Sequence, residues 1–121
     1  MASLPRLAIL LSTYNGEEFL DEQLDSILDQ SVKDIVIVVR DDGSSDETTA
    51  VLARYEKKYS EKFCLLPSDN QNLGAKGSFA CLMRYVLENK QALGLDRAYM
   101  MFADQDDIWV PQKAEYEFQR L

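Results

Sequence analysis

Two nearly continuous apolar segments, Leu7–Ser12 and Ile35–Val39, constrain the fold of this chain more than any other feature. Neither segment alternates between apolar and polar residues, and such a run is typical of a strand that is covered on both faces in a parallel sheet. The first segment is followed by residues 17–30, in which apolar side chains recur at helical spacing. We therefore predict an α/β fold in which helices flank a mostly parallel sheet.

The rest of the chain continues this alternation of strands and helices, with short connections that imply parallel strands. The predicted strands are residues 7–12, 35–40, 63–66 and 98–103. The predicted helices are residues 17–30, a second helix that opens with the capping box Ser44-x-x-Glu47 and ends near Lys58 or Tyr59, a third helix after the polar loop 68–77, and a last helix from Pro111 to Leu121. The apolar stripes predicted for the first and third helices are Phe19, Leu20, Leu24, Ile27 and Leu28, and Phe79, Leu82, Met83, Val86 and Leu87.

Composition restricts the function. With 121 residues, of which 46% are hydrophobic, the chain is expected to be a single domain with a real core. Lys and Arg are outnumbered 13 to 21 by Asp and Glu, and the formal net charge of −8 argues against nucleic acid as a partner. The absence of histidine excludes Ser-His-Asp and Cys-His catalysis and the usual zinc sites.

Cysteine use and hydropathy indicate a cellular location. Cys64 and Cys81 lie in apolar segments without metal-ligand spacing, so we expect reduced thiols and a reducing compartment. No charged and apolar leader precedes the first predicted strand, and no apolar stretch approaches the roughly 18 residues of a membrane span. We expect a cytoplasmic, soluble chain, and the full-length protein could still associate with the inner face of the membrane.

Acidic residues gather where two predicted strands end. Residues 104–107, with the sequence Asp-Gln-Asp-Asp, follow the fourth strand, and Asp41 and Asp42 follow the second. The carboxyl ends of parallel strands share one edge of the sheet, where α/β proteins bind ligands. Asp104 and Asp106 can reach one octahedral cation, which would allow a diphosphate to bind among carboxylates. The alternative is a solvated acidic turn that caps the last helix.

Other polar residues are expected at the same edge. Asp41 and Asp42 could accept hydrogen bonds from a base and a ribose, or they could belong to a turn that caps the following helix. Thr13, Tyr14 and Asn15 end the first strand, where the ring could stack on a base and the amide could bond to polar edges. Two neighbouring strand ends therefore offer candidate nucleoside contacts.

The loop Asn72–Gly77 contains Gly74 and Lys76 and precedes a predicted helix. A flexible backbone and one cation before a helix N-terminus are suited to phosphate contact. The loop matches neither Gly-x-x-x-x-Gly-Lys-Ser/Thr nor Gly-x-Gly-x-x-Gly, which excludes the usual phosphate-binding loops.

Four motifs occur in order at these predicted strand ends and loops. They are Ser12-Thr13-Tyr14-Asn15-Gly16, Asp41-Asp42-Gly43-Ser44-Ser45-Asp46, Asn72-Leu73-Gly74 and Asp104-Gln105-Asp106-Asp107-Ile108-Trp109. With them the chain resembles, over nearly its whole length, the family 2 inverting glycosyltransferases of GT-A fold, and most of all bacterial enzymes that add sugars, often rhamnose, to surface polysaccharides. The resemblance implies a truncated Rossmann-like GT-A fold, with residues 1–121 as a single donor-binding domain, the amino-terminal part of a longer enzyme.

The resemblance also implies roles for individual residues. Asp106 would bind Mg²⁺ or Mn²⁺ across the diphosphate of a nucleoside-diphosphate sugar, and Asp104, a second candidate metal ligand, would approach the ribose or sugar. Asp41 would hold the base. Of the other predicted substrate-binding residues, Thr13, Tyr14, Asn15 and Glu17 would line the nucleoside pocket, and the set is completed by Asp42, Gly74, Lys76 and Gln105.

The reaction that the resemblance implies is sugar transfer with inversion. The metal would stabilise the departing nucleoside diphosphate while a hydroxyl of a carbohydrate or lipid-linked acceptor attacks the anomeric carbon from the opposite face. Members of the family carry their catalytic base beyond the fourth strand, so we expect it after Leu121 and expect this fragment alone to be inactive.

Three alternatives remain open at this point. A signalling receiver domain holds Mg²⁺ with acids on a parallel sheet, and a haloacid-type phosphatase uses an Asp-x-Asp motif. Both place their acids after the first strand, where Leu11-Ser12-Thr13-Tyr14 has none. A non-catalytic nucleotide-sugar-binding module would keep the pocket without turnover.

Overall fold

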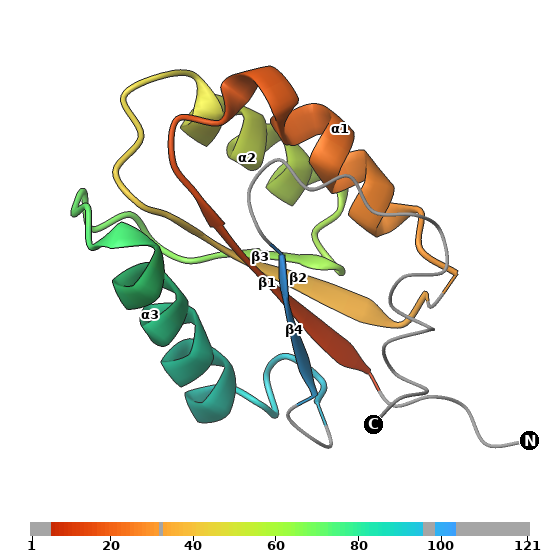
Figure 1. Ribbon diagram of the computed structural model, residues 1–121. Coiled ribbons are helices and arrows are strands. Elements are labelled where there is room, and N and C mark those ends of the chain that lie inside the picture. Colours follow the sequence, from red (N-terminus) through yellow and green to blue (C-terminus); the bar gives the residue numbers. More distant parts are fainter. Residues whose placement is uncertain (1–5, 32, 96–98, 104–121) are drawn as a thin grey trace, which may run out of the picture.

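The computed structural model describes residues 6–31, 33–95 and 99–103, which form a parallel four-stranded sheet flanked by helices (Figure 1). The strands are β1 (Leu7–Thr13), β2 (Ile35–Asp41), β3 (Phe63–Leu65) and β4 (Met100–Ala103), in the spatial order β3-β2-β1-β4. The helices are α1 (Glu17–Leu28), α2 (Thr48–Lys58) and α3 (Gly74–Glu88). The predicted α/β fold is confirmed for the described part of the chain.

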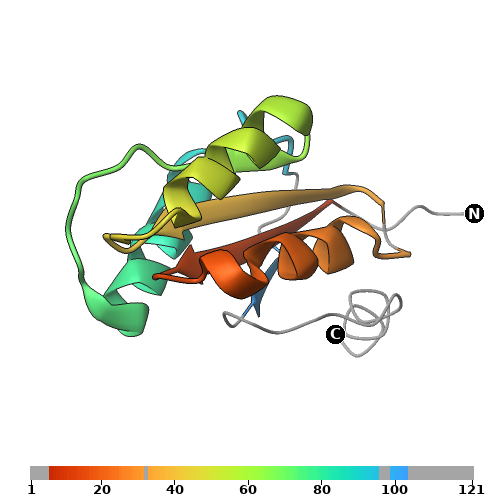
Figure 2. The ribbon, with the colours of Figure 1, turned by 90° about the horizontal axis from the view of Figure 1, so that it is seen from above.

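The two central strands, β1 and β2, are apolar up to Leu11 and Val39, as expected of strands that are covered on both faces. Successive side chains of a strand point to opposite faces. One set, which includes Ile9 and Ile37, packs against α1 and α2, whereas the other set, which includes Leu10 and Val38, packs against α3. In the ribbon views the pair α1 and α2 and the single helix α3 lie on opposite sides of the sheet (Figures 1 and 2).

The register of the sheet brings the carboxyl ends of three strands to one edge. Thr13 of β1 is the partner of Asp41 of β2, and Leu11 of β1 is the partner of Ala103, the last residue of β4. Leu66 donates from its backbone nitrogen to the oxygen of Val39 at 2.9 Å, so pairing continues one residue past β3, as far as the predicted strand. The turns after β1 and β2 are therefore neighbours in space.

Some predicted apolar positions on α1 and α3 are not buried. Leu20, Leu24 and Ile27 of α1 are buried, but Phe19 is 44% exposed, because it lies beside the stripe that faces the sheet. Prediction of a buried Phe19 was therefore wrong.

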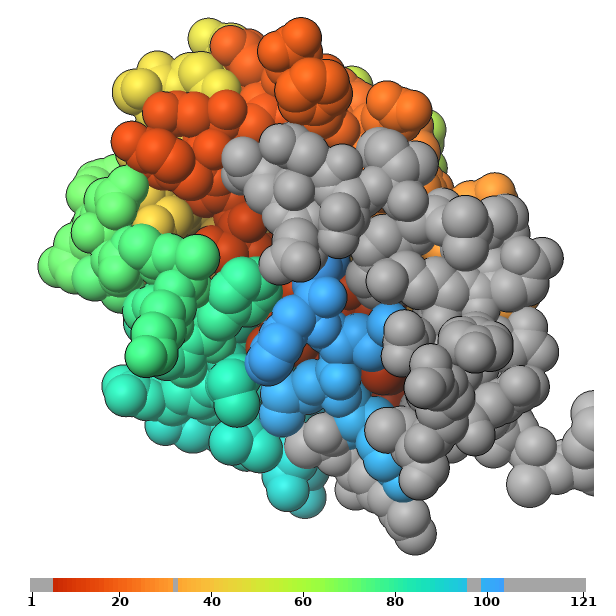
Figure 3. Space-filling model, in the orientation of Figure 1, coloured from red at the N-terminus to blue at the C-terminus, as the bar shows by residue number. Residues whose placement is uncertain are grey.

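On α3, Leu82 and Val86 are buried against the sheet, whereas Met83 and Leu87 are exposed, contrary to prediction. The helix packs on β1 and β2 through a narrow stripe, and β4 reaches the surface beside it (Figure 3). Phe102 of β4 is 52% exposed and contacts the ring of Phe79, with 5.2 Å between the ring centroids.

Two predicted helix starts were also wrong. The helix α3 begins at Gly74 and not after Gly77, and α2 begins at Thr48 without the predicted capping box. In both cases the N-terminus is bonded by a carboxylate that the local pattern did not indicate, as the site geometry shows below. The predicted last helix lies outside the described residues. Within the described ranges, no helix combines the length and apolarity needed to cross a membrane.

Candidate functional site

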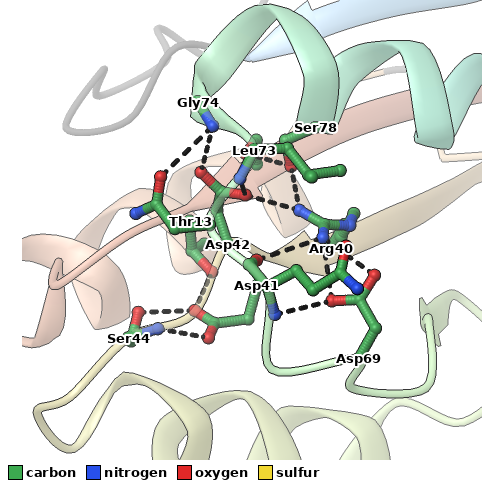
Figure 4. Close-up of polar contacts among 12 residues, drawn as sticks. Thr13, Arg40, Asp41, Asp42, Ser44, Asp69, Leu73, Gly74 and Ser78 are labelled. Carbon is green, nitrogen blue, oxygen red and sulfur yellow. Dashed lines mark hydrogen bonds and ion pairs between the residues drawn. The ribbon is translucent and has the colours of Figure 1, made fainter.

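Asp41 lies at the edge where β1 and β2 end, held by neutral donors (Figure 4). The hydroxyl of Thr13 donates to its Oδ1 at 2.8 Å. Ser44 donates from its hydroxyl to Oδ1 at 2.6 Å and from its backbone nitrogen to Oδ2 at 2.9 Å. This use of the Ser44 hydroxyl explains why it caps no helix. A carboxylate oxygen has about two lone-pair sites, so Oδ2 keeps one for a further donor.

The turns after β1 and β2 are fastened to each other by short hydrogen bonds. The Asn15 backbone nitrogen donates to the Ser44 hydroxyl at 2.8 Å, and the Ser45 backbone nitrogen donates to Asn15 Oδ1 at 2.8 Å. Asn15 has a positive φ of 48°, a conformation that asparagine tolerates better than most residues. Asn15, a predicted substrate-binding residue, therefore uses its side-chain oxygen to hold the turn after β2.

Asp46 performs the capping that was predicted for Ser44 and Glu47. Its carboxylate accepts from the Thr48 backbone nitrogen at 2.9 Å, at the start of α2, and from the Glu17 backbone nitrogen at 3.3 Å, at the start of α1. One carboxylate thus serves two helix N-termini, where negative charge is favoured. Asp46 holds the backbone of Glu17, whereas the Glu17 side chain is exposed.

Asp42 lies on the other face of β2 and is 3% exposed. Its carboxylate accepts from the backbone nitrogens of Leu73 at 2.8 Å and Gly74 at 3.0 Å, and so caps α3 from a distant strand. It also forms an ion pair of 2.6 Å with Arg40. The sequence predicted that the 72–77 loop would extend to Gly77, but this bonding lets the helix begin at Gly74.

Arg40 is the central cation of this face, and the sequence interpretation missed it. Its guanidinium donates to Asp69 at 2.9 and 3.0 Å, to the Ser78 hydroxyl at 3.0 Å and to the backbone oxygen of Gln71 at 3.2 Å, besides Asp42. Burial disfavours the charge, but the hydrogen bonds and charges of Asp69 and Asp42 outweigh it and raise the pKa of Arg40. The available signal was a charged residue on the buried face of an apolar strand, which requires a partner.

A cavity of about 340 Å³ opens between the end of β1 and the N-terminus of α3. Tyr14, 47% exposed, and the half-buried Phe79 are the aromatic residues in its lining. The full lining is Ser12, Tyr14, Asp42, Asn72, Gly74, Ala75 and Phe79. The structure thus brings three of the predicted site residues, Tyr14, Asp42 and Gly74, into one cavity.

Of the other predicted residues, some are described but lie outside the cavity lining, and some lie outside the described part of the chain. Thr13 and Asp41 are bonded to each other on the α1 and α2 side of the edge, and Lys76 is exposed on the first turn of α3, outside the cavity lining. Asp104, Gln105 and Asp106 lie outside the described residues. Among the residues that are described, no group of three or more potential metal ligands comes together.

The chain is 39% identical over 104 residues to the dTDP-rhamnosyl transferase RfbG of Shigella flexneri, an alignment that covers 85% of this chain and 34% of that protein. It is 30% identical over 115 residues to the putative glycosyltransferase EpsE of Bacillus subtilis, covering 95% of this chain and 38% of EpsE. The chain spans about a third of the length of such relatives.

Solved structures share the fold. The mannosyltransferase PcManGT from Pyrobaculum calidifontis, in complex with GDP-Man and Mn²⁺, superposes with a TM-score of 0.68 at 22% identity, over 87% of this chain and 28% of that one. S. aureus TarS 1-349 in complex with UDP gives a TM-score of 0.71 at 19% identity, over 95% and 31%. The arrangement of strands and helices is therefore that of the GT-A transferases.

The family description "Glycosyl transferase family 2" matches residues 8–121, nearly the whole chain. This match includes all four sequence motifs, and it leaves the receiver and phosphatase alternatives without support. The chain belongs to glycosyl transferase family 2, of which it carries the GT-A fold.

Proposed function

We propose that this chain binds a nucleoside-diphosphate sugar at the carboxyl edge of its sheet, and that the sugar is transferred with inversion to an acceptor hydroxyl in bacterial surface-polysaccharide synthesis. The observation that carries the proposal is the cavity between β1 and α3, which brings together Tyr14, Asp42 and Gly74 in a chain of this family. Relatives named for dTDP-rhamnosyl transfer and for teichuronic acid biosynthesis support the polysaccharide assignment.

The cavity has the properties of a nucleotide site. Its volume of about 340 Å³ falls within the range of small-molecule pockets, roughly 300–1,000 Å³. Tyr14 and Phe79 bring aromatic rings suited to packing against a base, and the start of α3 borders the cavity through Gly74 and Ala75. Asp41 keeps one lone-pair site on Oδ2, which we assign to a donor group of the base.

Asp104 and Asp106 are the residues that we assign to the metal. β4 ends at Ala103, beside β1, on the edge where the cavity opens, and these two acids follow directly in the sequence. Carboxylate oxygens are the ligands that Mg²⁺ and Mn²⁺ prefer. When bound there, either ion would supply charge stabilisation to the departing diphosphate. We place the catalytic base and the acceptor site in sequence beyond Leu121.

Thymine is the donor base to test first. RfbG, the relative named as a dTDP-rhamnosyl transferase, is 39% identical to this chain. We therefore propose a dTDP sugar as the donor, with UDP and GDP sugars as the competing classes.

Calorimetric titration with dTDP, UDP and GDP, each with and without Mn²⁺, tests the proposal. We expect dTDP to bind most tightly, to require Mn²⁺, and to bind at least about tenfold more weakly to Asp106→Ala, since a lost charged contact costs roughly 1.5–3 kcal/mol. Asp29→Ala is the matched control, because Asp29 is an exposed acid at the opposite end of α1. Metal-independent binding, or an equal loss in Asp29→Ala, would contradict the assignment.

A second measurement separates an enzyme from a binding module. Incubation of the chain with dTDP-sugar and candidate acceptors should leave the donor intact if the base lies beyond Leu121. Release of dTDP together with a glycosylated acceptor would show that the 121 residues are sufficient for turnover.

A further inference from the structure

Arg40 joins three parts of the carboxyl edge without lining the cavity (Figure 4). It bonds to Asp42 at the end of β2, to Asp69 in the loop before α3 and to Ser78 within α3. The side chain is 4% exposed, so a molecule in the cavity has little access to it. Any influence of Arg40 on a ligand must therefore pass through the groups that it holds.

The cluster depends on Arg40 for its charge balance. Asp42 and Asp69 are both acids, and without a cation between them a buried carboxylate would face a second negative charge. The hydrogen bond from Arg40 and a backbone hydrogen bond from Gln71 lower the pKa of Asp69, so this partner is ionised at neutral pH. The planar guanidinium can bond several groups at fixed angles, which a lysine ammonium cannot reproduce.

The cavity walls are the groups that this cluster fixes. Asn72, Gly74 and Ala75 follow the loop anchored through Asp69, and Gly74 donates to Asp42. On the opposite wall, the Ser12 hydroxyl donates to Ser78 Oγ at 2.6 Å. Since Arg40 donates to the same Ser78 oxygen, it ties the end of β1 to α3 as well.

We infer that Arg40 is a positioning residue for the nucleotide site, which sets the separation between the end of β1 and the N-terminus of α3 and thereby the affinity for the nucleoside diphosphate. This inference rests on the proposed function. A positioning role differs from a purely stabilising role in what substitution of Arg40 changes. Ligand affinity should fall by more than the loss of global stability explains.

The test compares Arg40→Lys and Asp69→Asn with the unchanged 121-residue chain, by calorimetric titration with dTDP in the presence of Mn²⁺. Arg40→Lys keeps the positive charge but loses the planar guanidinium that bonds several groups at once. We expect dTDP to bind at least about tenfold more weakly, because a small displacement of the cavity wall is enough to weaken binding. Asp69→Asn leaves the Arg40–Asp42 pair intact, and we expect a smaller loss of about threefold.

Ile27→Val is the control for global stability. Ile27 is fully buried in the last turn of α1, away from the cavity lining, so the loss of one methylene lowers the melting temperature without touching the edge. We expect its dTDP affinity to stay within about twofold of the unchanged chain, because both proteins are almost fully folded at the temperature of the titration.

Amide NMR signals supply a local readout that does not need ligand. The amide N–H groups of Leu73 and Gly74 donate to Asp42. In Arg40→Lys their NMR signals should shift and their protons should lose protection from exchange. The amide of Ser44, which Asp41 accepts on the other face, should not move. In Ile27→Val none of the three should change.

The outcomes are distinct. If the unchanged chain binds none of dTDP, UDP and GDP, the proposed function fails and the inference fails with it. If the unchanged chain binds dTDP and Arg40→Lys binds it within about twofold, or Ile27→Val loses as much affinity as Arg40→Lys, the positioning role alone is overturned. A selective loss in Arg40→Lys with shifted Leu73 and Gly74 amides supports it.

Discussion

Asp41 and Asp42 are adjacent residues with identical side chains, yet the two faces of β2 give them opposite surroundings. Asp41 continues the row that faces α1 and α2, is half-buried, and is held by the neutral donors of Thr13 and Ser44. Asp42 continues the row that faces α3, is 3% exposed, and is held by Arg40 and a helix N-terminus. One step along the chain therefore separates a half-buried carboxylate, which we propose as a ligand contact, from a buried one that caps α3 and pairs with Arg40.

The different surroundings of Asp41 and Asp42 explain how two adjacent carboxylates can lie at one edge of the sheet. On the α3 face, the buried charge is balanced within the protein, whereas on the α1 and α2 face the charge remains near solvent. The first face can be rigid because its groups are satisfied, and the second can offer a lone pair. Substitutions on the two faces should consequently differ in what they damage.

The largest expected effect is the difference between Asp42→Ala and Asp41→Ala in stability. Asp42→Ala leaves the Leu73 and Gly74 amides and one side of Arg40 without their carboxylate, and should cost about 3 kcal/mol of unfolding free energy. Asp41→Ala should cost about 1 kcal/mol, because water can reach the donors that it leaves. Urea denaturation of both variants measures the difference, and equal losses would contradict the different roles assigned to the two carboxylates.

Gly43 follows Asp42 directly, in the turn after β2. Its substitution should have an intermediate effect on stability. Its φ is +84°, and an added Cβ would lie 3.4 Å from the backbone carbon and oxygen of Gln71. Gly43→Ala should therefore destabilise the fold by about 1–2 kcal/mol. Gly43→Asn should lose less, since asparagine tolerates this conformation. A melting series in which alanine is the milder substitution would refute this account.

The smallest effect should appear in the pH dependence of stability. The bonds from Arg40 and from the Gln71 backbone lower the pKa of Asp69 from its ordinary value of 3.8. The unfolded chain therefore binds this proton more readily, so the carboxylate contributes stability above its ordinary pKa and loses that contribution as the pH falls through the lowered value. The difference in melting temperature between the unchanged chain and Asp69→Asn should shrink between about pH 5 and pH 2. A difference that stays constant with pH would exclude this linkage.

Prediction from sequence succeeded where one segment carries the whole signal. The uninterrupted runs in β1 and β2 indicated strands covered on both faces, and the alternation with helices indicated a parallel sheet. It failed where a partner is distant in sequence. Ser44 matched a capping box by spacing, but its hydroxyl accepts from the backbone nitrogen of Asn15, 29 residues away, and the α3 start depends on Asp42, which lies 32 residues from Gly74.

The sequence alone predicts the order of strands and helices and the edge at which polar residues gather, because apolar periodicity and strand direction are properties of local segments. It also carried the four motifs by which the chain belongs to glycosyl transferase family 2. Three-dimensional packing sets which acid of the pair at the end of β2 is buried and which cation balances it. Burial and ion pairing depend on which elements pack over each face of the sheet, and that is set by contacts between residues far apart in the chain.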